Sequence, residues 1–153
     1  MSVLMQIENE LGHFVTGSDR KDGERLQKLK AAGYDVYVGH NPDYARRADE
    51  VVFTGAAKIT DPEISAAAAA NVKTVERGKV LADVCDNFKK TVAVSGTHGK
   101  TTVTALLSEC FKNAGKKFCA HVGGEVNGFS GGFFFSGTDY MLTEACEYRK
   151  SFL

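Results

Sequence analysis

Apolar residues alternate between strand-like and helix-like spacing along the whole chain, and this alternation predicts an α/β fold with parallel strands. Strand spacing predicts strands at residues 13–16, 34–38, 50–54, 72–75, 91–94, 118–122, 132–135 and 140–143. Helical spacing predicts helices at 23–32, 42–47, 61–70, 78–88 and about 99–114, and the chain opens on a further helical pattern. The strand at 91–94 has the character of a buried strand, and Asp61-Pro62 is expected to cap the helix that it opens.

The pattern breaks at residues 86–90, and this break divides the chain into two parts. Residues 1–88 have room for a small sheet domain, but the residues after 88 end one acidic turn after a strand. An open parallel sheet needs several βαβ units of about 30 residues each. The sequence therefore predicts a first domain at 1–88 and an incomplete second domain at 89–153. Both ends look cut, since no strand precedes the first helix.

Composition and charge favour a soluble, cytoplasmic protein whose partners are small molecules. The chain has 153 residues, 43% of them apolar, which fits an ordinary globular protein. Nineteen Lys and Arg balance nineteen Asp and Glu, so no net positive field exists to attract nucleic acid or an anionic membrane. No apolar run approaches the roughly 18 residues of a spanning helix, and the start lacks the basic region of a signal peptide. The four cysteines lie far apart, which favours free thiols over a metal site.

A glycine-rich segment between the strand at 91–94 and the helix after it has the residue types that bind phosphate. Its sequence is Gly96-Thr97-His98-Gly99-Lys100-Thr101-Thr102. The glycines let backbone N–H groups turn toward phosphate oxygens, and the start of the helix adds its positive dipole end. Lys100 can neutralise the β- and γ-phosphates, and the Thr101 hydroxyl can ligate Mg²⁺. We therefore predict a nucleoside triphosphate site; the alternative is a glycine turn that only caps a helix.

Two further observations qualify this prediction. The segment is a shortened form of the general phosphate-loop pattern, which has a glycine where this chain has Val94. Glu144 follows the strand at 140–143, at the edge where ligands collect in open α/β sheets. Its carboxylate could hold Mg²⁺ beside Thr101, or it could be an ordinary solvated glutamate at a strand end. Glu147 is a weaker candidate of the same kind.

The loop from Gly96 to Thr102 resembles the ATP loop of the Mur ligases, the amide-forming enzymes of peptidoglycan precursor synthesis. Most members have asparagine where this chain has His98. Histidine there resembles the branch that attaches L-alanine, or a recycled tripeptide, to a nucleotide sugar. The likeness extends in order along nearly the whole chain, through Gly17-Ser18-Asp19, Gly39-His40, residues 54–57 with 61–63, Val122-Gly123-Gly124, and residues 144–147 with 151–153.

The resemblance implies that residues 1–88 form a Rossmann-like domain for the UDP part of the substrate and that residues 89–153 begin an ATP-binding P-loop domain. The residues expected to contact the UDP-sugar are Ser18, Asp19, His40, Thr54, Ala56, Gly124 and Asn127. An acidic residue at the end of a strand can accept hydrogen bonds from ribose hydroxyls, but Ser18 and Asp19 could equally cap the next helix. His40 and Asn41 are expected at the uridine, although Asn41-Pro42 is also an ordinary helix start.

The reaction implied by the resemblance uses ATP and Mg²⁺. The lactyl carboxylate of UDP-N-acetylmuramate attacks the γ-phosphate of ATP, and the amino group of L-alanine then attacks the acyl phosphate. Lys100, Glu144 and His98 are the expected catalytic residues, and Thr101 and Glu144 the expected metal ligands. His98 contacts a phosphate or orients the acyl group, unless it is a loop histidine packed for structure.

The sequence departs from the family pattern at several points and leaves alternatives open. Gly55 replaces one of a pair of serines, Cys146 replaces an aspartate, and the family's opening glycine-rich loop is missing. The chain is therefore expected to be an inactive fragment of the ligase. One alternative is the tripeptide-adding relative, another a non-catalytic nucleotide-binding fragment, and a third an unrelated P-loop NTPase whose strands all join one sheet.

Overall fold

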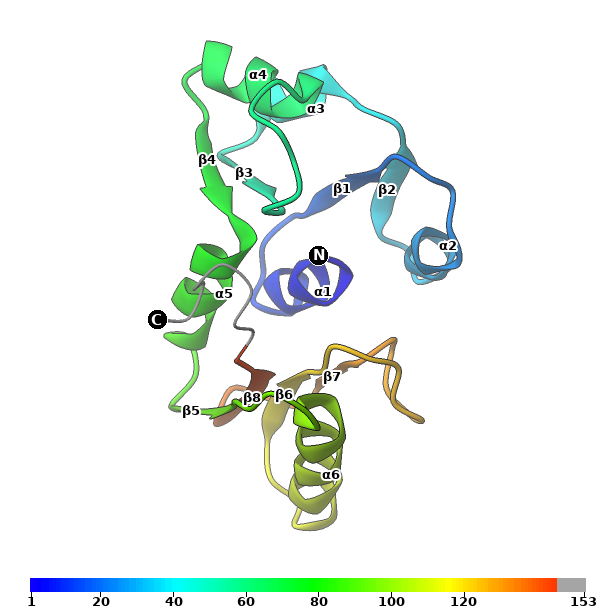
Figure 1. The fold of residues 1–153 in the computed structure, drawn as a ribbon, viewed down its shortest axis with the longest axis vertical. Coiled ribbons are helices and arrows are strands. Elements are labelled where there is room, and N and C mark those ends of the chain that lie inside the picture. The colour runs from blue at the N-terminus through cyan, green and yellow to red at the C-terminus, as the bar shows by residue number, and fades with distance from the viewer. Residues whose placement is uncertain (146–153) are drawn as a thin grey trace.

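The computed structural model describes residues 1–145 of the chain, and Figure 1 shows their arrangement. The helices are α1 (Ser2–Glu10), α2 (Glu24–Ala31), α3 (Pro42–Arg47), α4 (Pro62–Ala69), α5 (Arg77–Cys85) and α6 (Lys100–Asn113). The strands are β1 (Thr16–Asp19), β2 (Asp35–Val38), β3 (Glu50–Phe53), β4 (Lys73–Glu76), β5 (Lys90–Val94), β6 (Phe118–His121), β7 (Phe133–Phe135) and β8 (Tyr140–Glu144). None of the helices in this range is long and apolar enough to cross a membrane.

The order of elements agrees with the prediction, and most boundaries agree within one or two residues. The first strand is the largest difference, because it begins at Thr16 rather than at His13 and includes the Gly17-Ser18-Asp19 segment. Phe14, whose apolar side chain suggested the earlier start, is 87% exposed. Pairing with β2 determines the bounds of β1 instead, since Thr16 to Asp19 lie opposite Asp35 to Val38 residue by residue.

The strands form three separate sheets in the described part of the chain. β1 pairs with β2 and β3 with β4, each in parallel, and the third sheet has the order β5-β8-β6-β7. The first four strands thus form two parallel pairs rather than one continuous sheet. β7 runs antiparallel to β6, because the two are joined by a loop without a crossover helix. The separation of β5–β8 from the earlier strands excludes the single-sheet P-loop protein.

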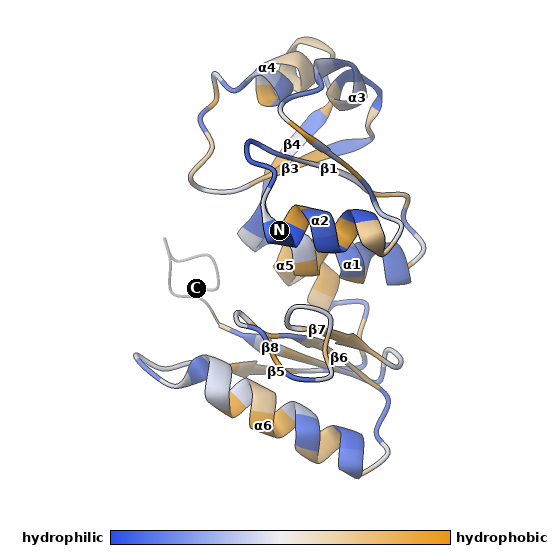
Figure 2. Cartoon of the chain, turned by 90° about the vertical axis from the view of Figure 1, so that its right-hand side faces the viewer, coloured by the Kyte–Doolittle hydropathy of each residue, from blue (hydrophilic) through white to orange (hydrophobic). Residues whose placement is uncertain are grey.

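The third sheet is covered on both faces (Figure 2). Side chains of a strand alternate between its faces, and on β6 Cys119 packs against α1 and α5 whereas Phe118 and Ala120 pack toward α6. The buried residues of α1 and α5 in this cluster are Val3, Leu4, Ile7, Val80, Leu81 and Val84. One apolar cluster therefore joins helices of residues 1–88 to the sheet of residues 89–145.

β5 is more exposed than its sequence predicts. Its burial was expected, but Lys90 to Ala93 are exposed and Val92 is 37% accessible. β5 is an edge strand whose pairing partner in the described chain is β8. A parallel strand is buried on both faces only when neighbouring strands and helices cover it, and that cover does not extend to this edge.

We expect the stability of the chain to fall in mildly acidic solution because of His121. This residue is 8% exposed, and its Nδ1 lies 3.0 Å from Thr143 Oγ1. Burial, with the positive charges of Arg77 and the N-terminal amine, lowers the pKa of His121 to about 4. The His121 ring therefore takes up a proton near pH 6.5 in the unfolded chain, but only near pH 4 in the folded chain. The contribution of His121 to the free energy of unfolding should be complete above about pH 6.5 and fall by about 3 kcal/mol as the pH drops toward 4.

Urea unfolding at several pH values across this range measures the effect. His121→Gln is the comparison variant, because it keeps a polar side chain beside Thr143 but removes the titrating ring. The variant should lose most of the pH dependence, whatever its stability at neutral pH. An equally steep loss in the variant would assign the effect to other groups.

Candidate functional site

The glycine-rich segment forms a tight loop between the end of β5 and the start of α6. Gly96 and Gly99 have φ angles of 145° and 77°, which residues with a side chain rarely adopt. Gly99 is the N-cap of the 14-residue helix α6 in the left-handed conformation. The Lys100 ammonium donates a hydrogen bond to the Gly96 carbonyl oxygen. The positive charge is therefore held over the loop at the positive end of the helix dipole.

Glu144 lies beside this loop. It is the last residue of β8 and the register partner of Val94, from which the chain enters the loop. Its Oε1 accepts a hydrogen bond of 2.7 Å from the Gly123 amide. A Cβ at Gly123 would lie 3.0 Å from Glu144 Oε2, tighter than most real contacts, so the carboxylate would have to move by a few tenths of an ångström. The absence of a side chain at this position therefore eases the close approach of the backbone to the carboxylate.

The next residue, Gly124, brings the same backbone segment to Thr101. A Cβ on Gly124 would be 3.0 Å from Thr101 Cγ2, so residues 123–124 run between the Glu144 carboxylate and the first turn of α6. A hydroxyl and a carboxylate are oxygen ligands of the kind that Mg²⁺ prefers. No group of three or more metal-binding side chains occurs within residues 1–145.

An open hollow of about 510 Å³ lies along the start of α6. Thr101 and Thr102 line it on the helix side, and Asn127 lines it on the side of the β6–β7 loop. The predicted substrate residue Asn127 is therefore close to the predicted nucleotide loop. His98 is exposed, which argues against the alternative that it is a loop histidine packed for structure.

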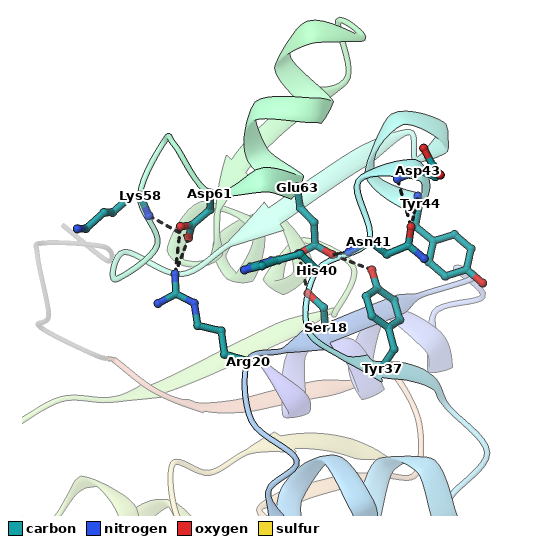
Figure 3. A network of polar contacts seen from close by, with 10 residues as sticks. All are labelled: Ser18, Arg20, Tyr37, His40, Asn41, Asp43, Tyr44, Lys58, Asp61 and Glu63. Carbon is teal, nitrogen blue, oxygen red and sulfur yellow. Dashed lines mark hydrogen bonds and ion pairs between the residues drawn. The ribbon is translucent and has the colours of Figure 1, made fainter.

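A second polar cluster gathers on the Glu63 carboxylate, in the first turn of α4 (Figure 3). Oε1 accepts hydrogen bonds from the Tyr37 hydroxyl (2.8 Å) and the Asn41 amide (3.0 Å). Oε2 accepts one from the Ser18 hydroxyl (2.7 Å) and lies 3.3 Å from His40 Nδ1. The ends of β1 and β2, the segment before α3 and the start of α4 meet at this carboxylate.

The charge of Glu63 is set by these contacts. Burial acts to raise the pKa of its carboxyl, but hydrogen bonds from Asn41, Ser18, Tyr37 and His40 outweigh burial and hold the pKa below its usual value. Burial and the bond to Glu63 also raise the pKa of the Tyr37 hydroxyl. Glu63 is therefore ionised and Tyr37 protonated at neutral pH.

Asp61 does not cap α4 with its side chain, which corrects the sequence prediction. Asp61 is at the N-cap position, but its carboxylate accepts hydrogen bonds from Arg20 Nη2 (3.0 and 3.1 Å) and the Lys58 amide (3.2 Å). The Arg20 guanidinium explains the difference, because hydrogen bonds between two ionised groups are strong and hold the Asp61 carboxylate away from the helix amides. The pair ties the end of β1 to residues 54–61, where the Ala57 amide donates to the Thr54 carbonyl.

Other predicted residues can also be located. Asn41 caps α3, accepting from the Asp43 and Tyr44 amides, so its role as a helix start is confirmed. Asp19 does not cap α2, whose N-cap is Gly23, and its Oδ1 accepts from the Lys21 amide instead.

The structure thus separates the predicted site into two groups. Ser18 and His40 meet at Glu63. Lys100 and Thr101 belong to the loop after β5 and the start of α6, with Gly124 against Thr101, Glu144 bonded to the neighbouring Gly123 amide, and Asn127 lining the same hollow as Thr101. Cys146 and Glu147 lie outside the described residues. Glu63 and Arg20 organise these contacts, and neither was predicted as a site residue from the sequence. The one available signal was the Asp61-Pro62-Glu63 helix start, where a carboxylate in the first turn is a common feature.

These features define an α/β protein with parallel sheets and helices on both faces of its larger sheet. The model described as "Mur ligase family, catalytic domain" matches residues 1–89, which is more than half of the chain. The chain belongs to the Mur ligase family.

Individual relatives match the chain over its whole length. The UDP-N-acetylmuramate–L-alanine ligase of Clostridium botulinum (strain Eklund 17B) is 39% identical over all 153 residues, and that of Clostridium beijerinckii is 38% identical. The chain covers 33% of each of these proteins, so it spans about a third of the length of the curated relatives that it matches.

Solved structures give the same likeness. The UDP-N-acetylmuramate-alanine ligase of Thermotoga maritima superposes with a TM-score of 0.87 at 30% identity, over 94% of this chain and 34% of that one. A ligase from Neisseria meningitides, whose name specifies L-alanyl-γ-D-glutamyl-meso-diaminopimelate, superposes with a TM-score of 0.84 at 27% identity, over 97% and 49%. The fold is therefore similar to both the alanine-adding and the tripeptide-adding enzymes.

Proposed function

We propose that this chain is part of an ATP-dependent ligase that joins L-alanine to the lactyl carboxylate of UDP-N-acetylmuramate, in peptidoglycan precursor synthesis. The observation that carries the proposal is the register of β5 and β8, which sets Glu144 opposite Val94 at the entry to the glycine-rich loop. Similarity to alanine-adding ligases over the whole chain supports the choice of substrate.

The glycine-rich loop is proposed to bind the triphosphate of ATP. Phosphoryl transfer to a carboxylate brings two anions together, so the site has to neutralise negative charge. The Lys100 ammonium and the backbone amides of residues 96–102 provide that neutralisation, and the exposed His98 can reach a phosphate or the acyl group. Thr101 and Glu144 would hold Mg²⁺, which supplies further positive charge at the transferred phosphate.

Residues 1–88 are proposed as the Rossmann-like part that binds UDP, and residues 89–153 as the beginning of the ATP-binding central domain. Ser18, Asp19 and His40 are assigned to the uridine, and Thr54 and Ala56 to the diphosphate. Gly124 and Asn127 are assigned to the muramoyl end. The contact of Gly124 with Thr101 supports this assignment, because the lactyl carboxylate must reach the γ-phosphate.

The chemistry then has two steps. The lactyl carboxylate attacks the γ-phosphorus of ATP, so that a C–O–P linkage forms and ADP leaves. The amine of L-alanine attacks the carbonyl carbon of this acyl phosphate, and phosphate leaves as the amide bond forms. A second candidate acceptor is a tripeptide, since the solved ligase from Neisseria meningitides is nearly as similar in fold.

Calorimetry and turnover measurements test the proposal. We expect the 153-residue chain to bind UDP-N-acetylmuramate and Mg·ATP without turnover. A chimaera in which this chain replaces the matching third of the Clostridium botulinum ligase should release ADP and phosphate and form the L-alanyl product. Tripeptide incorporation alone would change the acceptor. Turnover by the isolated chain would contradict its assignment as an inactive fragment, and failure of the chain to bind either nucleotide would overturn the proposal.

A further inference from the structure

Glu63 is the centre of the polar cluster at the ends of β1 and β2, and all four of its hydrogen-bonding positions are used. An ionised carboxylate only accepts, with two positions on each oxygen. Tyr37 and Asn41 use Oε1, and Ser18 and His40 use Oε2. The side chain of Glu63 is 17% exposed, so water has little room to replace these partners.

The protonation of the His40 ring follows from the charge of its partner. Because Glu63 cannot donate, the Nδ1 atom of His40 that faces Oε2 has to carry the hydrogen. In the neutral ring the other nitrogen, Nε2, is then a hydrogen-bond acceptor. Figure 3 shows one ring nitrogen directed away from Glu63. The His40 side chain is 31% exposed, so this edge of the ring is open to a ligand.

We propose that Glu63 is a positioning residue that fixes the His40 ring with Nε2 as an acceptor and thereby selects a uracil-type base. This inference rests on the proposed function, which assigns His40 to the uridine of the substrate. Uracil presents an imide N–H between two carbonyl oxygens, and an acceptor pairs with that N–H. Cytosine presents an unprotonated ring nitrogen at the same position, which would face His40 Nε2 acceptor to acceptor. A site built around one hydrogen bond rejects an analogue that leaves it unpaired.

The substitution Glu63→Gln tests this mechanism because the backbone dictates how the amide must lie. The Asn41 amide can only donate, so the glutamine carbonyl oxygen has to take the place of Oε1. The glutamine NH₂ group then faces Ser18 and His40. The serine hydroxyl can accept, but His40 can accept only if Nδ1 loses its hydrogen to Nε2. The variant should therefore reverse the tautomer and turn Nε2 into a donor.

Two measurements on the 153-residue chain read out this change. Nitrogen-15 NMR of histidine-labelled protein, at a pH where the ring is neutral, should show the hydrogen on Nδ1 in the unmodified chain and on Nε2 in Glu63→Gln. Calorimetry with UDP and CDP should show a preference for UDP of roughly tenfold or more in the unmodified chain, and little or no preference in the variant. Tyr37→Phe is the matched control, because it removes one hydrogen bond to Glu63 and leaves the His40 contact. It should keep both the tautomer and the preference.

The outcomes separate this inference from the proposed function. A preference for UDP that is unchanged in Glu63→Gln would overturn the inference and leave the proposed function standing. Absence of UDP binding by the unmodified chain, at intact fold, would overturn the proposed function and with it the selection of the base. The tautomer measured in the free chain still tests the positioning role in that case. A thermal unfolding midpoint for each variant shows that the fold is retained.

Discussion

Lys100→Ala is expected to abolish Mg·ATP binding by the chain and to lower turnover of the chimaeric ligase by roughly 10²- to 10³-fold or more. The ammonium is held over the loop by its hydrogen bond to the Gly96 carbonyl, at the start of α6. Removing it takes away a full positive charge at the place where the two anions of the first step are proposed to meet. The backbone amides remain in the variant and cannot replace that charge.

Isothermal calorimetry with Mg·ATP and an assay of ADP release measure this effect. Lys116→Ala is the matched control, because it removes the same charge from an exposed residue just beyond the other end of α6. It should leave both quantities unchanged. UDP-N-acetylmuramate binding should survive in Lys100→Ala, since residues 1–88 are proposed to provide that site. Undiminished turnover in Lys100→Ala would mean that this loop does not bind the triphosphate.

The predicted nucleotide loop and its neighbour Glu144 could be located from the sequence because their signals are local. Glycines and a lysine between a strand and a helix identify the loop, and the end of a parallel strand identifies the edge where Glu144 lies. The register of Val94 with Glu144 agrees with that expectation. The roles of these residues stay predictions until nucleotide binding is measured.

The cluster around Glu63 could not be predicted in the same way. Its partners are 22 to 45 residues away along the chain, and their meeting depends on how β1, β2 and α4 are placed in space. A tertiary contact also explains why Asp61 does not cap α4 with its side chain. Its sequence position predicts a helix cap, but its carboxylate binds Arg20 from the end of β1. Tertiary contacts of charged groups outweigh local preferences here.

The helices and strands show the same difference between features determined locally, which were predicted, and features determined by neighbouring elements, which were not. The prolines at positions 42 and 62 predicted the starts of α3 and α4 to within one residue, because proline acts on the backbone locally. The exposure of β5 and the antiparallel direction of β7 depend on neighbours instead. A strand of the composition of β5 is buried only if a further strand or helix covers it, and the direction of β7 follows from a connection that contains no helix.

Gly132→Ala is expected to destabilise the chain by about 3 kcal/mol or more. Gly132 has a φ of 92°, and a Cβ there would lie well inside van der Waals contact with the carbonyl oxygens of Val122 and Gly124. Both neighbours are backbone atoms, which cannot move aside as a flexible side chain would. The segment that would have to shift is the one that holds Glu144 through the Gly123 amide and touches Thr101 through Gly124. The variant should therefore also lose affinity for Mg·ATP.

Gly131→Ala is the control that separates backbone strain from collision. Gly131 also has a positive φ, of 59°, but a Cβ there would meet no atom within 4 Å. Its cost should be limited to about 1 kcal/mol, the penalty of the left-handed conformation for a residue with a side chain. Urea unfolding of the two variants measures the difference. Equal destabilisation would show that the close approach of residues 122–124 to Gly132 does not support the loop. A much larger destabilisation by Gly132→Ala would tie the stability of the fold to the geometry that brings Glu144 and Thr101 together.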